Sequence, residues 1–485
     1  MKKFLALTLA FIMMLTVLVS CNDKDDTPAQ TTAAETTTAA PETPQKSTKL
    51  YVGYGRADIT PRDKNGELIP VPLSGNNRVA NTIITDLFTS CTAIRDEAGD
   101  TVLFFTVDAL NIPTEIVGEI QNAVRKVTGV AARNIMITAS HAHSTPQLGN
   151  TGDQYIKQYK RDILFNAFAK AGEEAVNDLT LCTELYAGTL DGTGLSFIRR
   201  YVKDGQGNLK HEIEGDHTMP VVRFVREGKK DVILANWAAH CDTVSTINKY
   251  AISRDYYHYF TEQVEATLNA HLSIHNAASG DVNPFSKIPE ETVYRNTKAY
   301  GEALAALLIN NIGSLKKIDI ISDVEVEFKT IKLTVDHTKD DLLDKAVEIR
   351  NEYNSKGSTT KYKNMCTQYG IADIHEADAI YTKAHLDETD AMSLSAITIG
   401  NIAFGAAPYE MFTKTGMDIK ANSKFELTFA LGYTNGRKGY IPSEYAYELG
   451  DYEVYVCRYV KGTAEQIQGE LTQMLDNLYT RINEN

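Results

Sequence analysis

The hydrophobic residues of this chain follow two periodicities, one typical of strands and one typical of helices. Short apolar runs rich in β-branched residues predict strands at residues 89–95, 101–107, 134–138, 219–225, 232–236, 395–404 and 425–430. Longer periodic segments predict helices at residues 113–127, 154–177, 253–272, 294–311, 340–353 and 464–482. Residues 318–335 alternate like exposed or edge strands. This order of elements predicts an α/β fold, a single large domain with a mixed β-sheet flanked by helices.

Local signals refine some of these elements. Residues 96–100 are rich in turn formers and predict a hairpin between the first two strands. Pro113 suits the first turn of a helix, where its missing N–H has no partner to lose. Ser253 is expected to cap the helix that follows it. We interpret the amphipathic helix at 340–353 as part of an insertion.

The N-terminal residues are predicted to lie outside the folded domain. Lys2 and Lys3 precede an apolar run, which is the layout of a signal peptide over residues 1–20. An uncleaved anchor helix is the alternative. The sequence Leu-Val-Ser-Cys ending at Cys21 resembles the lipobox of bacterial lipoproteins. The resemblance implies that Cys21 is lipidated and tethers the protein to the outer face of the cell membrane without spanning it.

The segment after Cys21 differs in composition from the rest of the chain. Residues 21–48 are rich in Thr, Ala and Pro, and such a segment buries too little apolar surface to fold, so we predict a disordered stalk. No Pro/Gly/Ser-rich linker interrupts residues 49–485, which predicts one domain. The formal charge is −14, or −16 without Lys2 and Lys3. That balance argues against a nucleic-acid partner. The later cysteines show no metal-binding spacing, and any disulfide pairing stays open.

Candidate chemistry begins where the strand at 134–138 ends, at Ser-His-Ala-His. On extended backbone, His141 and His143 would point to the same side, because side chains repeat every two residues. Two imidazoles on one face form half of a metal site. The alternative is one buried core histidine and one surface histidine.

Other polar residues also follow predicted strands or lie in loops. They are Arg199, His240, Asn283, Glu410 and Tyr440. Each has a structural explanation when taken singly: His240 can be packed in the core, Glu410 can cap a helix, and Tyr440 is one of 25 tyrosines.

Taken together and in order, these segments resemble the catalytic domain of the neutral/alkaline, non-lysosomal ceramidases. The matching motifs are Val-Gly-x-Gly-x-x-Asp-Ile-Thr at 52–60, Ser-His-x-His-Ser at 140–144, the strand-end His240, Gly-Asp-Val-x-Pro at 280–284, Pro-x-Glu at 408–410, and Gly-Tyr-Ile at 439–441 with Tyr-Glu twelve residues on. Each motif is short, but six in order span about residues 50–460.

This resemblance implies zinc as the cofactor and a set of ligands. Carried over residue by residue, the ligands are His141, His240, Glu410 and Tyr440. Two histidines and one glutamate are a three-ligand set found at hydrolytic zinc sites, which keep a position for water. The phenol of Tyr440 is the unusual member.

The resemblance also implies catalytic residues. His143 lies beside the metal, while Arg199 and Tyr452 stabilise negative charge on the substrate carbonyl. The family's serine in Gly-Asp-Val-Ser-Pro is Asn283 here. A carboxamide is not a nucleophile, so the expected route is direct attack by metal-activated water.

The function implied is an exported, lipid-anchored zinc hydrolase that cleaves the amide bond of an N-acyl substrate, such as a ceramide-like lipid or a related amide. The alternatives are a zinc esterase or deacetylase acting on glycans, and a non-catalytic surface binding lipoprotein on a degenerate scaffold. The chain ends about 33 residues after Tyr452, so we expect the family's immunoglobulin-like C-terminal domain to be missing. A long apolar channel would favour lipid amides, and a shallow polar groove would favour glycans.

Overall fold

The computed structural model describes residues 48–74, 78–288, 290–291, 294, 296–355 and 358–484. These residues belong to one compact unit. The expected signal peptide, Cys21 and the stalk up to residue 47 lie outside the described residues. Among the helices that are described, none combines the length and the apolar character needed to span a bilayer.

The larger sheet contains nine of the described strands. They are β1 (Tyr51–Asp58), β3 (Phe88–Arg95), β4 (Thr101–Val107), β5 (Ile135–Ala139), β6 (Thr180–Asp191), β10 (Thr218–Arg226), β11 (Asp231–Trp237), β13 (Ala270–Asn276) and β15 (Lys316–Ile318). Their order is β13-β11-β10-β6-β1-β3-β4-β5, with β15 beside β6. Neighbours run antiparallel except at β4–β5 and β11–β13, which are parallel. The sheet is therefore mixed, as predicted.

A second sheet packs against the first. It consists of β16 (Val324–Thr334), β17 (Thr389–Ile399), β18 (Ile402–Ala406) and β20 (Leu427–Leu431). Phe104 of the larger sheet contacts Phe404 of the smaller one, with ring centroids 4.5 Å apart. Both belong to one buried apolar cluster that takes side chains from the two sheets. Burial of this shared surface holds the sheets together.

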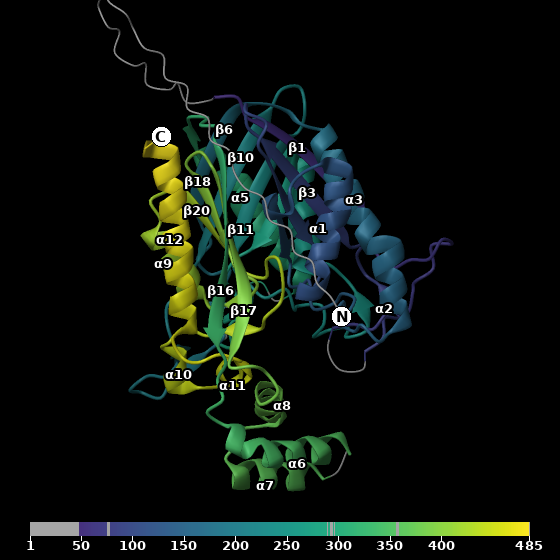
Figure 1. The fold of residues 1–485 in the computed structure, drawn as a ribbon, viewed down its shortest axis with the longest axis vertical. Coiled ribbons are helices and arrows are strands. Elements are labelled where there is room, and N and C mark those ends of the chain that lie inside the picture. Colours follow the sequence, from purple (N-terminus) through teal and green to yellow (C-terminus); the bar gives the residue numbers. More distant parts are fainter. Residues whose placement is uncertain are drawn as a thin grey trace, which may run out of the picture. The chain divides into compact units, whose positions relative to one another are not determined.

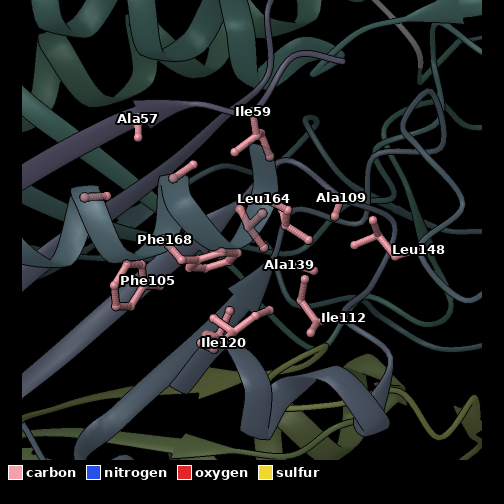
Figure 2. Packing of buried hydrophobic residues seen from close by; sticks show 14 of the residues in the cluster. Ala57, Ile59, Phe105, Ala109, Ile112, Ile120, Ala139, Leu148, Leu164 and Phe168 are labelled. Atoms are coloured by element: carbon pink, nitrogen blue, oxygen red, sulfur yellow. The ribbon is translucent and has the colours of Figure 1, made fainter. Parts of the chain in front are cut away.

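Helices cover the outer faces of both sheets (Figure 1). On the larger sheet lie α1 (Thr114–Thr128), α2 (Gln154–Tyr159), which continues into α3 (Phe165–Asn177), α4 (Tyr256–Leu268) and α5 (Thr297–Asn311). On the smaller sheet lie α9 (Thr413–Asn422) and α12 (Thr463–Glu484). Side chains between α1, α3 and the larger sheet form a core that includes Phe105, Ile120 and Phe168 (Figure 2). The fold is α/β, with helices on both sides, as the sequence predicts.

The glycines of the Val-Gly-x-Gly motif explain how α3 approaches β1. A Cβ atom on Gly53 would lie 2.0 Å from the carbonyl oxygen of Ala175, and one on Gly55 would lie 2.1 Å from that of Ala171. Any larger residue would force the helix away from the strand. The motif therefore has a packing role in this fold.

A helical segment is inserted between β16 and β17. It contains α6 (Leu343–Asn354), α7 (Thr359–Tyr369) and α8 (Ile374–Lys383) (Figure 1). The segment has its own small core, which includes Ile349, Ala377 and Ile380. Its helix α8 packs against α11 (Tyr452–Val456), which follows the short helix α10 (Ala446–Leu449). The insertion predicted around residues 340–353 is thus a three-helix unit.

Short paired strands complete the described structure. They are β2 (Thr82–Ile83) with β12 (Ala251–Ile252), β7 (Phe197–Ile198) with β14 (Val282–Asn283), β8 (Tyr201–Lys203) with β9 (Leu209–His211), and β19 (Glu410–Met411) with β21 (Tyr440–Ile441).

The prediction of one helix over residues 253–272 is wrong. The helix ends at Leu268, Asn269 adopts left-handed backbone with φ of 47°, and a strand begins at Ala270. The cap also differs, because the carboxylate of Asp255 accepts the Tyr256 N–H, while Ser253 Oγ accepts the Asp255 N–H. The apolar strand after Asn269 is short and can continue a helical pattern, so periodicity alone does not separate the two elements.

The single strand predicted over residues 395–404 is also wrong. Two antiparallel strands, β17 and β18, meet at Gly400 and Asn401. Gly400 has a φ of 51°, a conformation that glycine adopts without a steric penalty. A Gly-Asn pair inside an apolar run is therefore the turn of a hairpin.

Candidate metal centre and active site

The candidate site lies where the C-terminal ends of strands from both sheets meet. Isolated bridges pair Thr138 with Thr434 and Ala277 with Leu431, so the end of β5 and the residue after β13 contact the end of β20 and the segment that follows it. Asn276 also donates a hydrogen bond to the carbonyl oxygen of Ser140, at 3.2 Å. Loops after β5, β11, β13, β18 and β20 converge there, which brings together residues up to about 300 positions apart, such as Ile135 and Asn435.

His141 and His143 lie in the loop directly after β5. His141 is almost completely buried and adopts left-handed backbone with φ of 61°. The prediction that both histidines lie on extended backbone is therefore wrong. Their rings still meet, with the two Nε2 atoms 3.3 Å apart. A positive φ in a non-glycine residue is costly and is often found at functional sites.

Backbone carbonyls determine which nitrogen of each buried ring carries a proton. His141 Nδ1 lies 2.8 Å from the carbonyl oxygen of Leu110, and His240 Nδ1 lies 2.9 Å from that of Ser279. A carbonyl oxygen only accepts, so each Nδ1 donates, and in the neutral form of each ring Nε2 then keeps its lone pair. Burial also lowers the pKa of His240, which favours its neutral form. Both rings thus offer an unprotonated Nε2 to the same space, as histidine ligands of metals do.

Glu410 and Tyr440 reach this space from adjacent short strands. Strands β19 and β21 are parallel, with Glu410 opposite Tyr440. Glu410 Oε2 lies 3.3 Å from His141 Nε2 and 3.9 Å from His240 Nε2. This oxygen is buried and has no hydrogen-bond partner among the described residues. Burial raises the pKa of Glu410, but His141, Arg437 and Tyr440 outweigh that effect and bring it to about 2 when the His141 ring is protonated in the metal-free site. The carboxylate is therefore ionised at neutral pH.

These donors fit a metal ion. Two ligands at about 2.0–2.1 Å from a tetrahedral zinc lie about 3.3 Å apart. His141 Nε2 lies at that spacing from His143 Nε2 and from Glu410 Oε2. An ion among them would also give the lone carboxylate oxygen of Glu410 a partner, since a buried polar atom without one is costly. The buried group can hold a metal ion.

His143 is more closely tied to this group than the family resemblance implies. Ligand atoms of His141, His143 and His240 all lie within 4.8 Å of one another. The other nitrogen of His143, Nδ1, lies 3.8 Å from Asp242 Oδ2. Burial, together with His141, lowers the pKa of His143 to about 4, so its ring is neutral at pH 7. Geometrically, His143 can serve as a ligand or as a base beside the ion.

Arg199 binds the hydroxyl of Tyr440 and fixes its position. One guanidinium nitrogen, Nη2, donates to the Tyr440 hydroxyl at 3.0 Å, and Nε donates to Glu453 Oε1 at 2.8 Å. Although burial opposes it, the contacts with Tyr440 and Glu453 raise the pKa of Arg199. The Tyr440 hydroxyl lies 3.5 Å from His240 Nε2. The arginine is thus placed to present the phenol to the centre.

Tyr452 and Asn283 occupy different surroundings. The Tyr452 ring lies edge-on to Tyr440, with centroids 5.7 Å apart, and is 39% exposed. Asn283 is half-buried on β14, beside Val282, whose carbonyl oxygen accepts the His240 main-chain N–H. The segment around Asn283 therefore helps to hold His240, and a turn closed by the Val282 N–H and the Ser279 carbonyl precedes it.

A cavity of about 300 Å³ opens onto this group. Of the eight predicted metal-binding and catalytic residues, His141, His143, Glu410, Tyr440 and Tyr452 contribute to its lining. His240 and Arg199 contact these residues, and the described lining does not include Asn283. The rest of the lining comes from Leu110, His375, Asp378, Ala379, Thr382, Arg437, Gly439, Val456 and Arg458.

Several contributors are missing from the sequence-based prediction. Leu110 and Ser279 act through backbone carbonyls, which no side-chain pattern reveals. Glu453 orients Arg199 by accepting a hydrogen bond from it. Its position in the Tyr-Glu motif is the one feature of the sequence that could have indicated this role. No sequence motif marks the residues of α8 that line the cavity, because their position depends on how the inserted helices pack against α11.

Sequence comparison identifies no relative: no protein-family model matches the chain, and no curated protein does. Solved structures do match. The crystal structure of neutral ceramidase from Pseudomonas aeruginosa superimposes with a TM-score of 0.67 at 16% identity, over 90% of this chain and 75% of that chain. A structure described as ceramidase complexed with C2 gives a TM-score of 0.67 and 16% identity, over 90% and 76% of the two chains. This chain has the fold of these ceramidases.

Proposed function

We propose that this protein is a zinc-dependent hydrolase that cleaves the amide bond of an N-acyl substrate. The observation that carries the proposal is the arrangement of His141, His240 and Glu410. Carbonyl oxygens hold both Nδ1 protons, both Nε2 lone pairs face inward, and Glu410 Oε2 is buried without a hydrogen-bond partner in the described part of the chain. The shared fold with ceramidases supports the choice of amide hydrolysis.

Each residue has a proposed role. His141, His240 and Glu410 hold the ion, which when bound supplies a Lewis acid for the substrate carbonyl and lowers the pKa of water. His143 is neutral and accepts the proton of the attacking water, then returns it to the leaving amine as the C–N bond breaks. The products are a carboxylate and an amine.

The developing negative charge on the carbonyl oxygen needs donors. Because Arg199 donates to the oxygen of Tyr440, the phenolic hydrogen points away from the guanidinium, and once His240 Nε2 binds the ion that hydrogen is available to the substrate. Tyr452 lies at the mouth of the cavity and offers a second hydroxyl. Donors positioned for a developing oxyanion are worth about 10²–10³ in turnover each.

The volume and the lining of the cavity limit which substrates can bind. Its volume of about 300 Å³ is at the lower end of the range for small-molecule pockets. Polar side chains such as His375 and Thr382 share the wall with Leu110 and Val456. This lining supports a short or polar N-acyl compound at least as well as a long-chain lipid amide, and ceramide remains one candidate.

We further propose that the protein is exported and held on the cell surface by lipid on Cys21, with the stalk as a spacer. The lipobox-like sequence and the stalk composition support this proposal.

The function is tested on the purified protein without its N-terminal 21 residues. Elemental analysis gives the metal content, and amine release from a panel of N-acyl amides, including ceramide, gives the activity. Zinc at one equivalent and chelator-sensitive amine release are expected. Hydrolysis of esters or acetylated glycans alone would instead favour the esterase or deacetylase alternative.

A further inference from the structure

Two arginines in the cavity wall are not among the residues proposed to hold the ion or to act on the substrate carbonyl. Arg437 lies in the loop between β20 and β21, and Arg458 lies in the segment between α11 and α12. Both line the cavity that opens onto the candidate metal centre. Both also line a second, adjoining hollow of about 390 Å³ next to the start of α1. The two side chains therefore lie along the boundary between these hollows.

Neither guanidinium makes a hydrogen bond or a close ion pair in the described structure, although the charge of Arg437 helps to lower the pKa of Glu410. Arg458 is half-buried and Arg437 is exposed, and within the described residues neither side chain makes an ion pair or a hydrogen bond. Arg437 is instead held through its main chain, whose N–H donates to Thr114 Oγ1 at 3.2 Å. An arginine left unpaired beside an active-site cavity keeps all five of its N–H donors for a ligand.

Among the carboxylates around the two hollows, Asp378, Glu453 and Glu410 already have a role, whereas Glu115 is exposed to solvent. Asp378, in the same wall, pairs with Arg350 of α6 at 2.5 Å. Glu453 is occupied by Arg199 and Arg200. Glu410 belongs to the candidate metal centre, and Glu115, on the second hollow, is exposed in the first turn of α1. The positive charge of the two arginines thus remains available at the cavity.

We propose that Arg437 and Arg458 bind an anionic group of the substrate, so that the enzyme prefers N-acyl compounds carrying a carboxylate or a phosphate near the scissile amide. This inference rests on the proposed amide hydrolysis and adds the substrate class. A guanidinium matches the geometry of either anion with two parallel hydrogen bonds. An uncharged headgroup would leave both arginines without a partner.

The test compares three probes that share one acyl chain: N-hexanoylglycine, its phosphate counterpart N-hexanoyl-2-aminoethyl phosphate, and the neutral N-hexanoylglycinamide. Amine release gives kcat/KM for each probe. Calorimetric binding to the same protein carrying His141→Ala gives affinities without turnover. Because this variant is expected to lack the metal ion, the carboxylate of a probe has no ion to bind in it.

The anionic probes are expected to bind about 10- to 100-fold more tightly than the neutral one, the range for hydrogen bonds to charged groups. Raising NaCl from about 0.05 M to about 0.5 M is expected to shrink that preference by screening. The double variant Arg437→Gln/Arg458→Gln loses the preference and keeps its affinity for the neutral amide. Arg133→Gln, an exposed arginine on η1 (Ala132–Asn134), is the matched control and keeps the preference.

The outcomes separate this inference from the proposed function. Equal affinity for all three probes, or a preference that survives in the double variant, overturns the anion site even if neutral amides are hydrolysed. A preference that disappears with the arginines, in a protein that cleaves none of the amides, supports the anion site and contradicts amide hydrolysis. Comparing the carboxylate with the phosphate probe identifies which anion is preferred.

Discussion

His240 donates its Nδ1 proton to the carbonyl oxygen of Ser279, 2.9 Å away. The two residues follow β11 and β13, which are parallel neighbours, so their loops leave the sheet at the same edge. This contact leaves His240 Nε2 unprotonated and facing His141 and Glu410. Orientation of a histidine ring by a backbone carbonyl is what metal sites use to hold their ligands.

Metal content follows from that arrangement. The wild-type protein is expected to hold one zinc per chain, and His141→Ala or His240→Ala to lose both metal and activity, because each removes an Nε2 donor. Elemental analysis measures the metal. His385→Ala is the control, since His385 is exposed and its ring hydrogen-bonds the carbonyl oxygen of Tyr381. Stoichiometric zinc in either ligand variant would refute the assignment.

Tyr440→Phe separates a ligand from an oxyanion donor. It removes the hydroxyl that Arg199 holds and keeps the ring. We expect turnover to fall by about 10²–10³-fold, the range for one positioned donor, with zinc content unchanged. Rates and metal content are measured on one preparation. A parallel loss of zinc would show that the phenol is an essential ligand.

Asn283→Ala tests the residue that replaces the family's serine. Its turnover is expected to fall by about 10²–10³-fold, the range for one positioned donor, while zinc stays bound, because the carboxamide is proposed to donate to the substrate without forming a covalent bond. Intact-protein mass spectrometry during turnover tests whether a covalent bond to the substrate forms. An acyl adduct on any serine would contradict direct attack by water, and full activity in the variant would remove Asn283 from the site.

Asp281 is expected to make stability depend on pH. Burial raises the pKa of Asp281 to about 6, although the Thr413 N–H and the Tyr445 hydroxyl both donate to its carboxylate. The folded state therefore holds this proton more tightly than the unfolded chain, and the free energy of unfolding falls as pH rises from about 4 to about 6. The loss is about 3 kcal/mol.

The measurement is denaturant unfolding across that pH range. Asp281→Asn carries no ionisable group, so its free energy of unfolding should lack this fall. Asp242→Asn, a partly exposed carboxyl in a neighbouring loop, serves for comparison. Identical pH profiles of the wild type and Asp281→Asn would disprove the assignment.

Cys21→Ala tests the anchor. The variant is expected to leave the membrane fraction or to remain unprocessed, because lipid on Cys21 is the proposed attachment. Fractionation followed by mass determination distinguishes these two results. A fully processed protein that stays in the membrane fraction would exclude the lipoprotein interpretation.

Local pattern was enough for much of the fold. The hairpin of β3 and β4, the helix after Pro113 and the closing helix α12 follow from periodicity and turn residues, and the structure has them within a few positions of the prediction. Mixed strands and helices were enough to predict the α/β class. These features depend on neighbours in the chain, where period and turn chemistry act directly.

Sequence motifs that resemble those of the ceramidases also indicated His141, His240, Glu410 and Tyr440, and the structure brings all four together. Only the tertiary structure decided how they meet. The left-handed backbone of His141, the carbonyls of Leu110 and Ser279 that orient the rings, and the wall formed by α8 with Arg437 and Arg458 all arise from loops of two packed sheets and an inserted helical unit. The physical reason is that each depends on contacts between segments far apart in the chain, which local propensity does not specify.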